Sequence, residues 1–360
     1  MSIRFARRGL AGLAVAVAIA TLSAAGQAGA AGSKFFNVQN LISDSSAVSA
    51  AATDGSLVNG WGLSAGPTTP WWVANNGTST STLYSGVGSK SPLTVTVPGS
   101  PTGTVFNANT ADFSITQGGT TAASRFLFAT EGGSILGWAP TVAPTTAIAG
   151  VDNSAKGAIY KGLATLNDRL YATDFHNARV DVYDASWNPV ALPNGFSDPQ
   201  IPKGWAPFGI QALGGNIFVT YAQQDKAAKD EVAGGGLGYV DEYSPDGVLL
   251  ARVAKQGKPN APLNAPWGLA MAPPSFGVFG GDLLVGNFGS GRISAYLEKT
   301  PGHWVYKGQL AHADGSLVVI DGLWAIAFGN DSAGGPSSSL YFAAGPTGET
   351  HGLFGAITVG

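Results

Sequence analysis

Residues 162–183 read GLATLNDRLYATDFHNARVDVY. In this stretch Gly162, Leu163 and Ala164 form a small apolar run, residues 170–173 are β-prone, and residues 179–183 alternate polar and apolar side chains. Turn-forming residues separate the three runs, at 167–168 and 174–177. Short alternating runs between turns are typical of antiparallel strands. The stretch therefore predicts three neighbouring strands of one small sheet.

The same three-strand sequence motif repeats along the chain. Its second run has six copies, at residues 71–74, 126–129, 170–173, 217–220, 283–286 and 340–343. Its opening run recurs around four glycines, Gly62, Gly162, Gly209 and Gly268, with weaker copies at residues 323–327 and, in the interval between Gly62 and Gly162, at residues 111–114. A fourth strand often follows, as at residues 93–97 and 248–253.

The spacing of these glycines predicts the fold class. Gly162 and Gly209 are 47 residues apart, and Gly209 and Gly268 are 59 apart. Four-stranded units at this period are the signature of β-propeller blades. Six copies predict an all-β, six-bladed β-propeller with four-stranded blades, whereas a β-sandwich or a β-helix predicts no such phrase at this period.

The chain ends in the third strand of the sixth unit, at residues 353–358, so that unit has no fourth strand of its own. Residues 35–42 read FFNVQNLI and precede the first repeat. We predict that this N-terminal strand pairs with the last blade and closes the ring, because closure hides an edge strand that would otherwise promote aggregation.

The N-terminus has the pattern of an export signal. Arg4, Arg7 and Arg8 precede an uncharged apolar run at residues 9–22, and residues 28–30 read AGA. This predicts a signal peptide at residues 1–30, a propeller domain at residues 31–360 and a secreted or periplasmic location. The apolar run is shorter than the roughly 20 residues of a membrane-spanning helix, and the adjacent arginines leave both general secretory and twin-arginine export open.

Composition excludes several classes of function. The chain has 11% charged residues, a net charge of −3 and no cysteine. It therefore lacks disulfides, thiol catalysis and cysteine metal sites, and its charge does not favour nucleic-acid binding. The sequence also lacks the G-x-S-x-G, H-E-x-x-H and Walker motifs, so it is uncertain whether the protein is an enzyme. We expect a monomer without a membrane anchor.

The repeat predicts where a binding site would form. In a propeller, the loops that enter the first strand and those that follow the second strand open on one face. The entry positions carry mostly aromatic and carboxamide residues, namely Asn59, Trp61, Lys161, Trp205, Phe208, Asn264, Trp267 and Trp324. The positions that follow the second strand of each blade carry Asn75, Asn76, Glu131, Asp174, His176, Asn177, Gln223, Gln224 and Asn287. Such a channel mouth suits a small polar ligand, a sugar or a hard cation.

Each candidate also has a structural interpretation. Trp61 and Trp267 precede an anchor glycine and are more often packing residues than ligand contacts. Turn-position Asn and Asp residues such as Asn75 more often hydrogen-bond backbone amides. His176, beside Asp174, is a candidate general base, although a lone loop histidine is more often a surface residue.

Four of the residues that follow a second strand form a candidate metal site, namely Asn76, Glu131, Asp174 and Asn287. If they occupy one repeat position on four blades, their oxygens converge near the channel axis. Oxygen ligands favour calcium, and two charges among four ligands predict weak binding. The alternative is four independent turn caps.

Two motifs carry a resemblance to a known family. Asn59-Gly60-Trp61-Gly62-Leu63 and the run PWWVANNGT at residues 70–78 resemble an uncharacterised family of bacterial exported proteins, whose members open with Asn-Pro-Trp-Gly-Leu and Phe-Trp-Val-x-x-Asn-Gly-Thr. Residues 265–270 and 286–289 extend the resemblance over most of the chain, and Gly60 replaces the usual proline. More broadly, the repeat resembles NHL-type propeller repeats. The family offers no activity to carry over.

Two classes of function follow. The first is a non-catalytic binding or scaffold protein that uses the channel mouth for a small polar ligand or an extracytoplasmic protein. The second is a divalent-metal-assisted hydrolase or lactonase, which this chain resembles only as a gluconolactonase-like propeller; a shared fold does not transfer function.

Overall fold

The computed structural model describes Met1 and residues 32–360, and residues 32–360 form one compact unit. The predicted signal peptide, residues 1–30, lies outside the described residues apart from Met1. No helix within residues 32–360 has the length and apolar character needed to cross a membrane.

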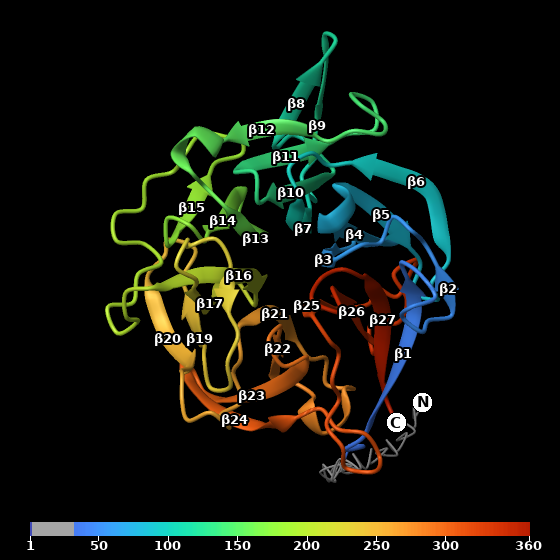
Figure 1. Ribbon diagram of the computed structural model, residues 1–360, viewed down its shortest axis with the longest axis vertical. Coiled ribbons are helices and arrows are strands. Elements are labelled where there is room, and N and C mark those ends of the chain that lie inside the picture. The colour runs from blue at the N-terminus through green and yellow to red at the C-terminus, as the bar shows by residue number, and fades with distance from the viewer. Residues whose placement is uncertain (2–31) are drawn as a thin grey trace. The chain divides into compact units, whose positions relative to one another are not determined.

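Six small sheets surround a central channel, which confirms the six-bladed propeller (Figure 1). Blade 1 contains β3 (Gly60–Ser64), β4 (Trp71–Asn75), β5 (Thr80–Tyr84) and β6 (Lys90–Thr96). Blade 2 contains β7 (Pro101–Phe106), β10 (Phe126–Thr130), β11 (Ser134–Trp138) and β12 (Ile148–Asp152). Blade 3 contains β13 (Tyr160–Leu166), β14 (Arg169–Asp174) and β15 (Arg179–Tyr183).

The other three blades follow in chain order. Blade 4 contains β16 (Trp205–Leu213), β17 (Asn216–Gln224), β19 (Tyr239–Tyr243) and β20 (Leu249–Ala254), with the short β18 (Glu231–Val232) paired to β17. Blade 5 contains β21 (Pro266–Met271), β22 (Leu283–Asn287), β23 (Arg292–Thr300) and β24 (His303–Gln309). Blade 6 contains β25 (Leu323–Phe328), β26 (Leu340–Ala344), β27 (Leu353–Val359) and β1 (Phe36–Ser43), with β2 (Ala52–Thr53) beside β1. Three 3-10 turns complete the elements, η1 (Asn76–Thr78), η2 (Ser154–Lys156) and η3 (Gly277–Phe279).

The N-terminal strand closes the ring, as the sequence predicted. β1 pairs antiparallel with β27, from Phe36 opposite Val359 to Ser43 opposite Leu353. Phe36 is fully buried and its ring lies 5.0 Å from that of Phe276 and 5.8 Å from that of Phe279. The first and last segments of the propeller domain therefore share one sheet, and β1 covers the edge of β27.

Blade 3 has only three strands. After β15, the backbone N–H of Val190 donates to the carbonyl of Val182 at 2.7 Å, and Tyr183 bridges Pro189. No longer ladder forms there, because Pro189 and Pro193 flank the segment and proline has no N–H to donate.

Glycines let the innermost strands approach one another around the axis. A Cβ atom on Gly162 would stand 2.9 Å from the carbonyl oxygen of Phe208 in the next blade, and one on Gly268 would stand 2.6 Å from that of Trp324. These are backbone atoms, so they cannot rotate away. The sequence repeat at these glycines thus reflects a steric demand.

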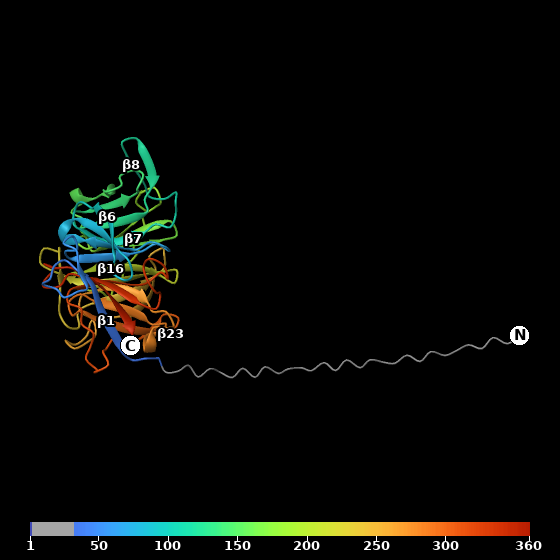
Figure 2. The ribbon, with the colours of Figure 1, turned by 90° about the vertical axis from the view of Figure 1, so that its right-hand side faces the viewer.

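The predicted anchor of blade 2 at residues 111–114 is wrong. The innermost strand is β7, and a Cβ atom on its Gly103 would stand 2.5 Å from the backbone nitrogen of Leu163. Polar Thr102 and Thr104 flank Gly103, so the apolar phrase of the other blades is missing there. Residues 111–113 instead lead into a hairpin of β8 (Ser114–Gln117) and β9 (Thr120–Ala123), which projects from the rim (Figures 1 and 2).

Replacing Gly268 with alanine is expected to lower the free energy of unfolding by about 1–3 kcal/mol through overpacking. Gly55→Ala is the matched control, because a Cβ atom there has no neighbour within 4 Å and the backbone is not left-handed. Urea denaturation of both variants measures the difference. Equal stability of the two would contradict the close approach of β21 and β25.

Candidate functional site

The candidate site lies at the channel end where the innermost strands begin. Aromatic side chains fill the axis there. The ring centroids of Trp61 and Trp324 are 3.7 Å apart in a stacked arrangement, and Phe288 stacks on Trp324 at 4.0 Å. Phe208 and Trp267 pack edge-on against Trp324, at 5.8 and 6.0 Å. These five rings, here called the aromatic plug, form the floor of the site.

A buried ion pair lies against this plug. Lys161, the second residue of β13, has a side chain only 1% exposed, and its Nζ is 2.7 Å from Oε1 of Glu131. The same Nζ lies 4.9 Å from the ring centroid of Trp61 and 3.3 Å from Oδ1 of Asp230, in the loop that carries β18. An ammonium over an aromatic face gains cation–π attraction, which is stronger away from water.

Carboxamides extend the ion pair into a network. Asn76 Nδ2 donates to Glu131 Oε2 at 2.9 Å, and Asn59 Nδ2 donates to Glu349 Oε2 at 2.7 Å. Trp324 Nε1 donates to Asn59 Oδ1 at 3.0 Å, which ties the network to the aromatic plug. We call the group formed by Asn59, Asn76, Glu131, Lys161, Asp230 and Glu349 the mouth. Its side chains come from five blades and the loops between them.

The two charges of the central pair stabilise each other. Burial alone would raise the pKa of the Glu131 carboxyl, but the Lys161 charge and the hydrogen bonds from Lys161 and Asn76 hold that pKa below its usual value. Burial alone would lower the pKa of Lys161, but Glu131, Glu231 and Asp230 raise that pKa overall. Both groups are therefore charged at neutral pH.

Two further carboxyls behave differently. Burial raises the pKa of Glu231 to about 8, with only partial compensation by the Lys161 charge. Burial also raises the pKa of Glu349, against the hydrogen bond from Asn59. Several carboxyl groups in and beside the mouth thus share one buried ammonium, and Glu231 is mainly protonated at neutral pH.

The strand pairing shows that the four predicted metal ligands occupy two different positions of the repeated blade. Gly60 pairs with Asn75, Tyr160 with Asp174, and Pro266 with Asn287, so Asn75, Asp174 and Asn287 are equivalent. In blade 2, Pro101 pairs with Thr130. Asn76 and Glu131 therefore stand one residue later than Asp174 and Asn287, and successive residues point to opposite sides of a strand.

Residues at the earlier position form hydrogen bonds within their own blades. Asp174 is fully buried, and its carboxylate accepts hydrogen bonds from the backbone N–H of Ile159 and of Asn177, both at 3.2 Å. Asn287 Oδ1 accepts from the N–H of Asn264 at 2.9 Å. Asn75 Nδ2 donates to the hydroxyls of Thr80 and Thr82, both at 3.0 Å.

Residues at the later position face the channel. Phe175 and Phe288 stand there and pack on Phe208 and Trp324, at 5.2 and 4.0 Å. Asn76 and Glu131 are their polar counterparts and contact each other directly. The structure therefore brings together two of the four predicted ligands, while Asp174 and Asn287 bond to their own turns.

The two predicted calcium ligands that meet are part of the network around Lys161. Within residues 32–360 no group of three or more His, Asp or Glu side chains has the arrangement to hold a metal ion. Glu131 already uses one oxygen for Lys161 and the other for Asn76. Calcium binding at this place stays a prediction from the sequence.

The remaining predicted residues lie around the same end of the channel. Trp61 and Trp267 are buried in the aromatic plug, and Trp267 Nε1 donates to the carbonyl of Lys161 across the axis at 3.2 Å. His176 is exposed, with Nδ1 3.3 Å from the carbonyl oxygen of Ala228. Its ring contacts a loop rather than the Lys161–Glu131 pair.

Three acidic residues in or beside the mouth had no signal in the repeat. Asp230 and Glu231 belong to the long loop of blade 4, and Glu349 to the loop between β26 and β27. These loops occur once each, so comparing blades gives no position for them. Asn59 and Lys161, in contrast, are entry positions that the repeat projects onto this face.

Comparison with known proteins identifies relatives without an assigned activity. No family model matches the chain. Two proteins of Acanthamoeba polyphaga mimivirus, each described only as uncharacterized, match over most of it. R648 is 33% identical over 291 residues, which cover 77% of this chain and 70% of R648. L690 is 31% identical over 338 residues, which cover 89% of this chain and 85% of L690.

A third mimivirus protein, R640, is longer than the matching region. It is 36% identical over 234 residues, and these cover 63% of this chain but only 42% of R640. The relatives found are viral, so a bacterial exported family stays a prediction from the sequence motifs.

Solved structures show the same fold at low identity. A protein of unknown function from Bacteroides thetaiotaomicron has a TM-score of 0.55 at 12% identity, covering 89% of this chain and 76% of that one. A glucose dehydrogenase has a TM-score of 0.52 at 13% identity, and the match covers 90% of this chain and 99% of that one. Virginiamycin B lyase from Staphylococcus aureus has a TM-score of 0.50 at 14% identity, and the match covers 90% of this chain and 99% of that one.

At such low identities the likeness to solved structures extends to the fold alone. The match to the viral proteins is closer and spans most of two of them. The chain belongs to the same protein family as R648 and L690 of Acanthamoeba polyphaga mimivirus.

Proposed function

We propose that this protein is an extracytoplasmic binding protein that takes a small polar ligand at the mouth. The observation that carries the proposal is the network around Lys161, in which side chains from separate blades converge on one buried ammonium. Such convergence near the propeller axis places several polar groups within reach of one ligand. The extracytoplasmic part rests on the sequence of residues 1–30.

The charge states of Lys161 and Glu131 favour ligand orientation over acid–base or nucleophilic roles for these two residues. A lysine must lose its proton to act as a nucleophile or base, yet the surroundings raise the pKa of Lys161. A glutamate must be poised near the working pH to transfer protons, yet the pKa of Glu131 is lowered. Both groups are fixed ion-pair partners, which suits orientation of a ligand.

The chemistry of the mouth favours a ligand with hydroxyl or amino groups. Asp230 has a side chain that is 53% exposed, so its carboxylate oxygens remain accessible to a ligand. These oxygens accept hydrogen bonds from hydroxyl or ammonium groups. Sugars and amino sugars therefore fit the mouth better than anions, which its carboxyl groups would repel.

A metal-assisted lactonase is the weaker alternative. It needs a carboxylate free to hold a cation, and the Glu131 carboxylate is already neutralised by Lys161. An extracytoplasmic protein as partner has no observation here that favours it over a small ligand.

The test is a thermal-shift screen of neutral sugars, amino sugars and lactones, with and without calcium, followed by calorimetry. We expect a sugar or amino sugar to raise the melting temperature, and Asp230→Asn to weaken its binding at least several-fold. Asp246→Asn is the matched control, because Asp246 is also an exposed aspartate in a salt bridge, with Arg169. It should bind like the wild type.

Other outcomes would overturn the proposal. Absence of a shift with every sugar and amino sugar would remove its support. Steady hydrolysis of a lactone by the purified protein, lost in Glu131→Gln, would establish the hydrolase instead.

A further inference from the structure

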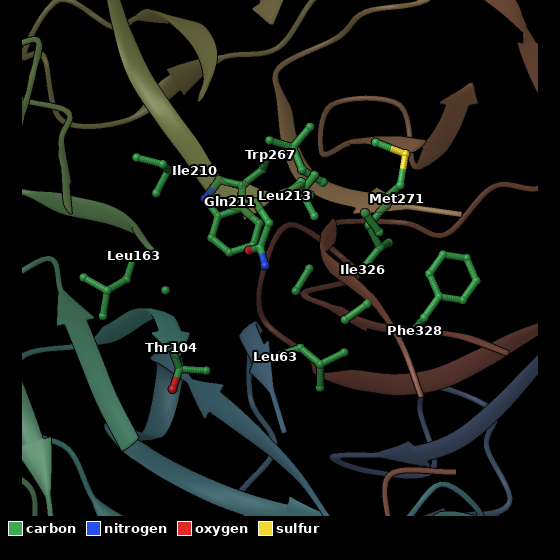
Figure 3. Close-up of a pocket in the computed structure, with 16 residues that line it drawn as sticks. Leu63, Thr104, Leu163, Ile210, Gln211, Leu213, Trp267, Met271, Ile326 and Phe328 are labelled. Carbon is green, nitrogen blue, oxygen red and sulfur yellow. The ribbon is translucent and has the colours of Figure 1, made fainter. Parts of the chain in front are cut away.

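A second cavity lies at the opposite end of the channel from the mouth. The residue after each anchor position lies on the far half of its innermost strand, and in five of six blades it is aliphatic. The set is Leu63, Thr104, Leu163, Ile210, Leu269 and Ile326. Together with the ends of β16, β21 and β25 they line a cavity of about 270 Å³, here called the funnel (Figure 3).

The funnel is closed at its inner end. Trp267 lines it and also belongs to the aromatic plug, so the funnel stops where the plug begins. Met271 is 38% exposed and the side chains of Leu213 and Phe328 are half-buried, which places these three residues toward the solvent end. The funnel and the mouth are thus separate sites on one axis.

The lining of the funnel is uncharged. None of its residues is Asp, Glu, Lys, Arg or His, and Thr104 uses its hydroxyl to donate to the carbonyl of Leu127 at 3.0 Å. Gln211 is exposed, and its carboxamide points toward the middle of the ring of labelled side chains (Figure 3). Besides Gln211, the polar surface of the funnel comes mainly from backbone groups, which carry no net charge.

We propose that the funnel binds an uncharged, mainly apolar small molecule that directs one polar group to Gln211. An apolar ligand would remove the aliphatic ring from solvent, which favours binding. A charged ligand would lose its hydration without meeting an opposite charge. Since ligand pockets usually span about 300–1,000 Å³, the volume limits the ligand to about one aromatic ring or a short aliphatic chain.

The experiment uses 4-fluorotoluene, observed by ¹⁹F NMR in the presence of the full propeller. Its signal is expected to shift and broaden in a saturable way, whereas 4-fluorobenzylammonium, which has the same ring and a charge, should bind at least tenfold more weakly. Equal binding of the two probes would overturn the uncharged character of the ligand.

Two variants locate the site. Ala327→Phe fills the funnel from a half-buried position, and Met271→Glu puts a charge at its rim. Each should weaken 4-fluorotoluene binding at least tenfold. Val87→Glu, at a position 79% exposed and outside the funnel, should bind like the wild type. If Ala327→Phe fails to give the wild-type melting profile, Met271→Glu alone decides. Wild-type binding in a folded funnel variant would overturn the proposal.

Discussion

Replacing Glu131 with glutamine is expected to lower the free energy of unfolding by about 3 kcal/mol at neutral pH, because it leaves a buried ammonium without its main partner. Lys161 is 1% exposed and cannot turn to solvent, and its other partner, Asp230, is more distant, at 3.3 Å against 2.7 Å. Removing one member of a buried pair typically costs about 3–5 kcal/mol. The remaining contact with Asp230 places our expectation at the lower end.

A double variant distinguishes the effect of the unpaired Lys161 charge from the effect of lost side-chain packing. In the double variant Glu131→Gln with Lys161→Met, no unpaired charge remains, and an apolar chain of similar length lies on Trp61. We expect the double variant to be more stable than Glu131→Gln alone. Urea denaturation of the three proteins measures this. If the double variant were the least stable, the buried charge would not be the cause.

Replacing Glu231 with glutamine is expected to raise the free energy of unfolding at pH 8.5 by about 3 kcal/mol more than it does at pH 4.5. This figure includes a reduction for the partial exposure of the side chain. Burial raises the pKa of this carboxyl to about 8 from an ordinary 4.5. Between these values the folded state holds a proton that the unfolded state has released. The wild type therefore loses stability as pH rises through this window, and glutamine, which stays neutral, does not.

The stability effects of the Glu131 and Glu231 substitutions should depend on pH in opposite directions. The pKa of Glu131 is lowered in the folded state, so its contribution is present above its unfolded pKa and is lost as the pH falls. Glu131→Gln should therefore cost more at pH 8 than at pH 4, the reverse of Glu231→Gln. Denaturation midpoints at several pH values check both slopes, and a pH-independent effect of Glu231→Gln would contradict its burial as a neutral acid.

The sequence alone determined the architecture. Six copies of a three-strand phrase gave the number of blades, and glycine before an aliphatic residue marked four of the innermost strands, because their backbones approach too closely for a Cβ atom. The unpaired end of blade 6 predicted the role of β1. Backbone crowding and edge pairing act within each repeat or between its neighbours, so they leave a periodic trace in the sequence.

The make-up of the mouth was decided only by the tertiary structure. Asn76 and Glu131 stand one residue further from the second strand than Asp174 and Asn287, so they face the channel while Asp174 and Asn287 cap turns. A shift of one residue reverses the side of a strand, and residue types alone do not reveal it. Asp230, Glu231 and Glu349 reach the mouth from loops that occur once each. Their meeting with Lys161 depends on how the ring brings distant blades together, which no local pattern encodes.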